Sequence, residues 1–259
     1  MMKKRRTALT AVLMMSLALA ACGSNRAGSA DTGATSAPAA ASGEETAAEE
    51  AATDAGSGET ESPAETANSF SAEGFVRGVI TETSYESSML GIRYDAPEDY
   101  MILDEEMMQQ VMQIATAMSS EETAELLAQG QAVVDFYTMN AQNGWNASIA
   151  FESLDVMNQS LVMAGAVSIE DIMDANLASY RQIFESQGAT GVEVVRTETS
   201  FLGQPTPCVQ ASMTVNNVLL FQKLIYIVSR DGAYLGALTV TTNGEDATQT
   251  ILDCFTAIP

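Results

Sequence analysis

Alternation of hydrophobic and polar residues marks several β-strands in the second half of the chain. Two such stretches, about 132–140 and 146–154, are separated by Asn143-Gly144, a frequent hairpin turn. Four more strands are predicted in a row, at about 192–201, 207–215, 218–229 and 233–242. Asn216-Asn217 and Asp231-Gly232 join the last three of these, and strands joined by such short turns are antiparallel.

Helical spacing of apolar residues marks the other elements. After Asp104, apolar residues at helical spacing predict a helix to about residue 117. Ser168 and Asp171 form a capping-box pattern before a second apolar stripe that Gly188 ends. We expect a short strand at about 89–94, a short helix ending at Gly130, a loop over 155–167 and a final helix over 245–257.

This order of elements predicts the α+β class. Residues 71–259 are expected to form one domain, an antiparallel sheet of about six to seven strands sandwiched by helices. The strands at 218–229 and 233–242 are apolar on both faces, which predicts a central position with both faces covered.

The N-terminus has the pattern of an export signal. Basic residues at 3–6 precede an apolar run over 8–20, which is too short to span a bilayer stably. The run ends in Leu19-Ala20-Ala21-Cys22, which resembles the lipobox of bacterial lipoproteins. The resemblance implies a signal peptide over 1–21, cleavage before Cys22 and diacylglycerol on its thiol. The alternative is an ordinary signal peptide with an incidental cysteine.

Residues 22–70 are expected to be a disordered linker after the lipidated cysteine. Between 23 and 69 no side chain is aromatic, and no aliphatic one is larger than alanine. Such a segment cannot bury enough apolar surface to offset the entropy lost on ordering. We therefore expect a tether that holds the domain away from the lipid surface.

Net charge excludes several classes of partner. Removal of residues 1–21 takes away four of the 11 basic residues and none of the 34 acidic ones, so the net charge changes from −23 to −27. This argues against binding of nucleic acid, and it leaves the lipid on Cys22 as the expected membrane attachment.

No histidine is present, which removes His-based catalysis and most zinc sites. Lys223, the one lysine after cleavage, lies in an apolar run without a Ser-x-x-Lys pattern, and we expect no cofactor.

Two groups of side chains are candidates for chemistry. Asp95, Glu98 and Asp99 lie in one loop, and a pair of these carboxylates would suit a hydrolase. Methionines gather in one region, where they would suit a soft-metal site, an adaptable partner groove or plain core packing. These methionines are Met101, Met107, Met108, Met112 and Met118.

Cys208 and Cys254 are a candidate disulfide pair. Export makes the compartment permissive for disulfides, and lipidation of Cys22 leaves an even number of thiols. The alternative is two separate small buried residues.

Several short motifs, in order, resemble the PsbP-like family. They are 90–97, 201–205, Gly232-Ala233-Tyr234 and 251–255. This fold is shared by the extrinsic photosystem II protein, a Ran-binding import factor and many bacterial lipoproteins. The resemblance implies an α/β/α sandwich used mainly for protein contacts, and it supplies no site residue.

The sequence therefore predicts a lipid-anchored, extracytoplasmic protein at the cell membrane that binds or scaffolds an envelope protein without catalysis. The alternatives are a carboxylate-pair hydrolase and a lipoprotein that binds a small ligand or metal. The contact surface is expected on an exposed sheet edge or in the methionine-rich region.

Overall fold

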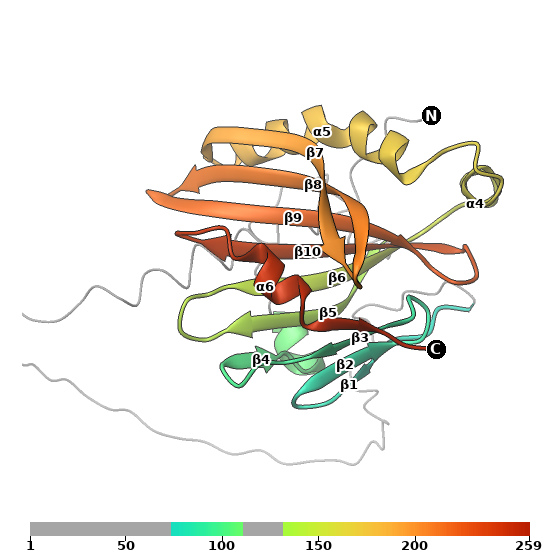
Figure 1. Cartoon of the computed structure of the whole chain (residues 1–259), viewed down its shortest axis with the longest axis horizontal. Helices are drawn as coiled ribbons and strands as arrows, with labels where there is room; N and C mark the ends of the chain where they lie inside the picture. The colour runs from blue at the N-terminus through green and yellow to red at the C-terminus, as the bar shows by residue number, and fades with distance from the viewer. Residues whose placement is uncertain (1–73, 111–131) are drawn as a thin grey trace, which may run out of the picture. The chain divides into compact units, whose positions relative to one another are not determined.

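The computed structural model describes residues 74–110 and 132–259, and these form two antiparallel sheets with a few helices. The larger sheet has seven strands in the order β4-β5-β6-β10-β9-β8-β7, and the smaller has four in the order β1-β2-β3-β11 (Figure 1). The α+β class with an antiparallel sheet of about seven strands is confirmed.

The larger sheet follows the hydrophobic alternation closely. Its strands are β4 (Tyr100–Ile102), β5 (Ala132–Asn140), β6 (Asn146–Ser153), β7 (Thr190–Phe201), β8 (Gln204–Val215), β9 (Val218–Val228) and β10 (Tyr234–Asn243). Asn216 and Asn217 both have positive φ, as the predicted β8–β9 turn requires. β10 lies between β6 and β9, so the strand predicted to be central is central.

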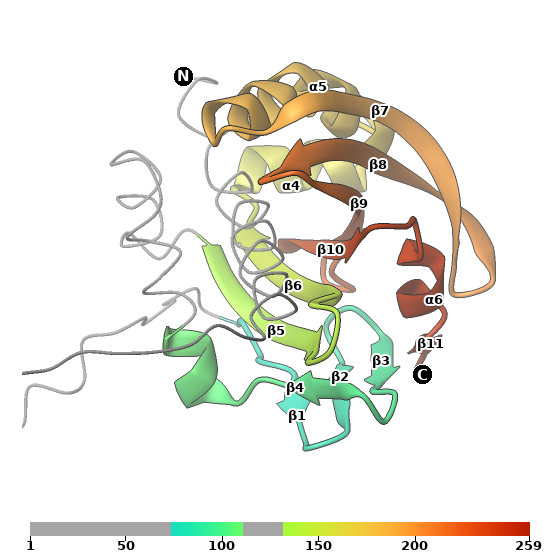
Figure 2. The same cartoon turned by 90° about the vertical axis from the view of Figure 1, so that its left-hand side faces the viewer.

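Helix α5 (Ile169–Ser186) packs on one face of this sheet. Ser168 caps it with the predicted capping box, in which Ser168 Oγ accepts from the Asp171 N–H and Asp171 accepts from the Ser168 N–H. α5 lies along β7 and β8 (Figure 2). Its buried residues Met173, Tyr180 and Phe184 pack in a cluster with side chains of β8, β9 and β10. On the β4–β6 side, residues 105–110 are helical and contribute Met108 to a separate cluster.

The small sheet packs on the opposite face, where helices were expected. Its strands are β1 (Val79–Ile80), β2 (Ser84–Ser87), β3 (Ile92–Asp95) and β11 (Phe255–Ala257). Tyr85 stacks on Phe136 of the large sheet with ring centroids 4.5 Å apart, and Tyr94 lies 5.1 Å from the same ring. These aromatic side chains are fully buried and join the two sheets in one core.

Besides the small sheet, two segments after residue 150 differ from the sequence predictions. The final helix is short, because α6 (Thr248–Leu252) ends early and the chain continues as β11, which pairs with β3. The pairing places Phe255 4.9 Å from Tyr94, so burial of an aromatic ring in the core outweighs helical spacing. The predicted loop over 155–167 contains α4 (Val156–Met163).

Candidate functional site

Helix α4 presents an apolar surface to solvent. None of its residues is buried, and Val156, Met157 and Met163 are 78%, 68% and 64% exposed. Leu161 completes what we call the α4 surface. Apolar side chains gathered on one exposed element indicate a contact site more strongly than scattered ones do.

The ends of α4 are held by specific contacts. Asp155 caps its N-terminus, where the Asp155 side chain accepts a hydrogen bond from the Asn158 N–H at 2.8 Å. Met163 lies against Gly232 in the β9–β10 turn. A Cβ at Gly232 would lie 2.5 Å from Met163 Sδ, and the residue has φ +71°, so a larger residue there would be strained and would displace Met163. The helix is thereby fixed to the sheet while its apolar side chains stay outside the core.

The α4 surface carries no charge. Residues 156–168 contain no acidic or basic side chain, in a chain with net charge −23. An uncharged helix with exposed methionines suits an apolar groove of a partner, because methionine adapts its shape to the surface that it meets. The sequence analysis missed this site because α4 has no buried face, so its apolar residues do not recur at helical spacing. The absence of charged residues over 156–168 was the one signal in the sequence that could have indicated this surface.

The methionine-rich region is divided by the structure. Met101 lies on the edge strand β4 and is partly exposed, Met107 is half-buried, and Met108 is buried in the cluster with Leu103. Met112 and Met118 lie outside the described residues. Where the structure describes this region, core packing explains Met108, whereas the Met101 side chain is exposed to solvent.

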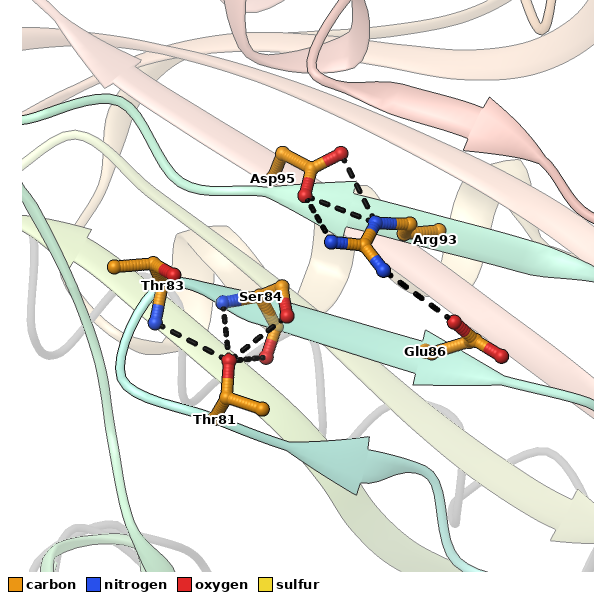
Figure 3. A network of polar contacts seen from close by, with 6 residues as sticks. All are labelled: Thr81, Thr83, Ser84, Glu86, Arg93 and Asp95. Atoms are coloured by element: carbon orange, nitrogen blue, oxygen red, sulfur yellow. Dashed lines mark hydrogen bonds and ion pairs between the residues drawn. The ribbon is translucent and has the colours of Figure 1, made fainter.

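The predicted carboxylates lie in different surroundings. Asp95 accepts from Arg93 through both Nε and Nη2, at 2.7 to 3.1 Å, and Glu86 lies 3.5 Å from Arg93 Nη1 (Figure 3). The Arg93 guanidinium lowers the pKa of Asp95, so this carboxyl is ionised near neutral pH and is unsuited as a general acid. Asp99 Oδ1 instead accepts from Gln142 Nε2 at 3.1 Å.

A second set of hydrogen bonds closes the turn between β1 and β2. Thr81 Oγ1 accepts from the backbone N–H groups of Thr83 and Ser84, at 3.4 and 2.9 Å (Figure 3). The Thr81 hydrogen bonds and the Arg93 ion pairs are contacts within the small sheet and its turn. In the described part of the chain, no group of three or more His, Cys, Asp or Glu side chains is placed to hold a metal ion.

Cys208 and Cys254 are free thiols in the structure. Cys208 is fully buried on β8, and burial raises its pKa to about 11, which the nearby Lys223 ammonium partly offsets. Cys254 lies half-buried between α6 and β11, near Asp253 and Asp95, and burial raises its pKa as well. Lys223 lies near the Cys208 sulfur, whereas aspartates lie near the Cys254 sulfur. A disulfide between the two cysteines stays a prediction.

The anchor and the linker lie outside the described residues, as do Cys22 and the proposed boundary near residue 70. Within residues 74–110 and 132–259, no helix is long and apolar enough to cross a membrane.

Comparisons with known proteins leave the family open. No family model matches the chain, and no curated protein matches it. Among solved structures it is similar to LpqN, involved in cell envelope biogenesis of Mycobacterium tuberculosis, at 15% identity and a TM-score of 0.31. The match covers 65% of this chain and 83% of LpqN. Similarity this low supports no argument, and the PsbP-like resemblance stays a prediction.

Proposed function

We propose that this chain is a lipid-anchored, extracytoplasmic binding protein that contacts an envelope protein through the α4 surface, without catalysis. The observation that carries the proposal is a capped helix whose apolar side chains are exposed and uncharged. The lipobox-like sequence ending in Cys22 supports attachment to the membrane.

A protein partner fits the α4 surface better than a lipid surface does. Segments that dock on anionic membranes carry lysine or arginine beside their apolar side chains, and α4 has neither. The strongly acidic chain would also be repelled by anionic lipid. The groove of a partner offers shape complementarity to a helix of about two turns and needs no charge.

Anchoring allows a small contact surface to be sufficient. Four side chains are fewer than a stable standard interface uses, so we propose that α4 forms the apolar centre of a modest, transient contact. Two proteins held at the same membrane meet at a high effective concentration, which offsets a low intrinsic affinity.

Crosslinking in intact cells, followed by purification of the anchored protein, tests this proposal. The test variant carries Val156→Glu and Met157→Glu, which leave the contact of Met163 with Gly232 intact. Val195→Glu is the control, because Val195 is exposed and belongs to β7 rather than to α4. We expect a crosslinked envelope protein with wild type and Val195→Glu, reduced at least tenfold with the α4 variant. Equal yields from all three would show that α4 is not the contact surface.

A Cys22→Ser variant tests the anchor separately. We expect the wild-type protein to pellet with membranes and the variant to stay in the supernatant. Equal pelleting of the two would refute lipid attachment at Cys22.

A further inference from the structure

Methionine side chains gather at the β4 edge of the large sheet, on the face that bears the helices. Met101 on β4 is paired directly with Met139 on β5, so the two side chains project from the same face. Met107 lies in the first turn of the helical residues 105–110, where Asp104 Oδ1 accepts a hydrogen bond from the Met107 N–H at 2.8 Å. We call Met101, Met107 and Met139 the thioether group.

One small cluster brings the members of the thioether group to the same part of the sheet. Met107 and Met139 both pack against the buried cluster that contains Leu103 and Met108. Leu103 lies two residues from Met101 on the extended chain, so alternation places these two side chains on the same face. Met107 is therefore held near the pair that the strand register forms.

The thioether group is accessible from solvent. Met101 is 40% exposed, and Met107 and Met139 are half-buried. Met108, by contrast, is 6% exposed and belongs to the core of the cluster. A metal ion can therefore approach the thioether group from solvent, while packing against the cluster restricts the movement of Met107 and Met139.

The pair of Met101 and Met139 has a spacing that suits a shared ion. The Cβ atoms of residues paired across antiparallel strands lie about 5 Å apart. Each sulfur is carried beyond Cβ on an unbranched, flexible chain, so both sulfurs can turn toward an ion between them. Packing alone would be satisfied by the β-branched and aromatic side chains that strands prefer, and those side chains carry no sulfur.

The chemistry of the thioether group selects a soft ion. Thioether sulfur suits copper(I), whereas Mg²⁺ and Ca²⁺ take oxygen ligands. The chain contains no histidine, which is a common ligand of copper(II), zinc and nickel. Glu105 and Glu106, which are exposed and precede Met107 in the chain, favour the approach of a cation.

We propose that Met101, Met107 and Met139 bind one copper(I) ion. The ligands are neutral and accessible from solvent, so the bound ion keeps its charge and exchanges readily. This suits capture and transfer of copper(I) more than permanent retention. The site shares no residue with the α4 surface, and it stands or falls independently of the protein contact proposed there.

Titration with silver(I), a redox-stable probe that also prefers thioether sulfur, tests the site by NMR of ¹³C-methyl-labelled methionine in the full chain. Cys22→Ser and Cys254→Ser are present throughout, because those thiols would compete for the ion, whereas Cys208 is fully buried. We expect the methyl signals of Met101, Met107 and Met139 to shift together, before those of the other methionines.

Met101→Leu and Met139→Leu remove a sulfur and keep a similar apolar volume, so the melting temperature should change little. Each should weaken silver(I) binding by about tenfold or more. Copper(I), supplied with bicinchoninate as a competing chelator, should rank the variants in the same order. The controls are Met108→Leu in the adjoining cluster and Met157→Leu on α4, which should bind as the unsubstituted protein does.

Three results would overturn the proposal. The first is the absence of silver(I) binding. The second is a simultaneous shift of the Met157 signal and those of the thioether group, which would show adventitious binding to exposed methionines. The third is equal affinity of Met139→Leu and Met108→Leu, whether both are unchanged or both weakened, because a ligand and a core residue must differ.

Discussion

A buried carboxyl group, that of Asp135, holds the N-terminal part of the described chain against the large sheet. Asp135 is 1% exposed and lies at a register shift in β5. Its Oδ2 accepts hydrogen bonds from the Tyr85 hydroxyl at 2.8 Å and the Gly78 N–H at 2.9 Å. Arg77 approaches only to 3.8 Å. Burial raises the pKa of Asp135, and these three groups act in the opposite direction.

Tyr85→Phe removes one of these hydrogen bonds without changing the ring. A hydrogen bond to a charged group contributes about 1.5–3 kcal/mol, so we expect the free energy of unfolding to fall by about 2 kcal/mol. In a domain of this size the melting temperature should fall by about 4–8 °C. In an Asp135→Asn background the bond joins neutral groups, and the same change should cost only about 1 kcal/mol.

Urea unfolding of wild type, both single variants and the double variant measures this difference as a double-mutant cycle. Tyr94→Phe is the control, because the Tyr94 hydroxyl is buried without a hydrogen-bond partner, and its loss should cost little. Equal costs of Tyr85→Phe in both backgrounds, or a cost no larger than that of Tyr94→Phe, would refute the view that Tyr85 stabilises a charged Asp135.

Three further predictions follow from the same contacts. Because folding raises the pKa of Asp135, this carboxyl contributes most to the free energy of unfolding below its unfolded pKa near 4, and the contribution is lost as pH rises through the folded pKa. As pH is lowered from 7 to 4.5, wild type should therefore gain stability relative to Asp135→Asn in urea unfolding. A difference between the two proteins that does not change with pH would contradict this. If both cysteines are free thiols, as in the structure, iodoacetamide at pH 8 should modify Cys254 faster than the buried Cys208 in the folded protein. Absence of modification at both cysteines in the denatured, unreduced protein would instead establish the predicted disulfide. Deletion of residues 23–69 with Cys22 retained should lower the yield of the α4-dependent crosslink, because the domain would lie too close to the membrane; an unchanged yield would make the linker dispensable.

The four C-terminal strands of the large sheet could be predicted because local signals agree there. Alternation fixes which face is buried, and turns such as Asn216-Asn217 fix the register. The capping box at Ser168 likewise located the start of α5. Each of these features depends on residues close together in sequence.

The small sheet and the α4 surface could not be predicted in the same way. β3 overlaps the strand predicted at about 89–94, but β11 has only three residues, too few for a clear alternation. The pairing of β3 with β11 joins distant parts of the chain. α4 lacks a buried face, so its side chains show no helical period.

Photocrosslinking at position 157 in living cells tests the central claim most directly. A photoreactive amino acid replaces Met157 on α4 in one strain and Val195 on β7 in another, with the anchor intact. We predict a discrete crosslinked product with one envelope protein from position 157 and none from position 195. Absence of a product at 157, or the same products from both positions, would contradict a protein contact through α4.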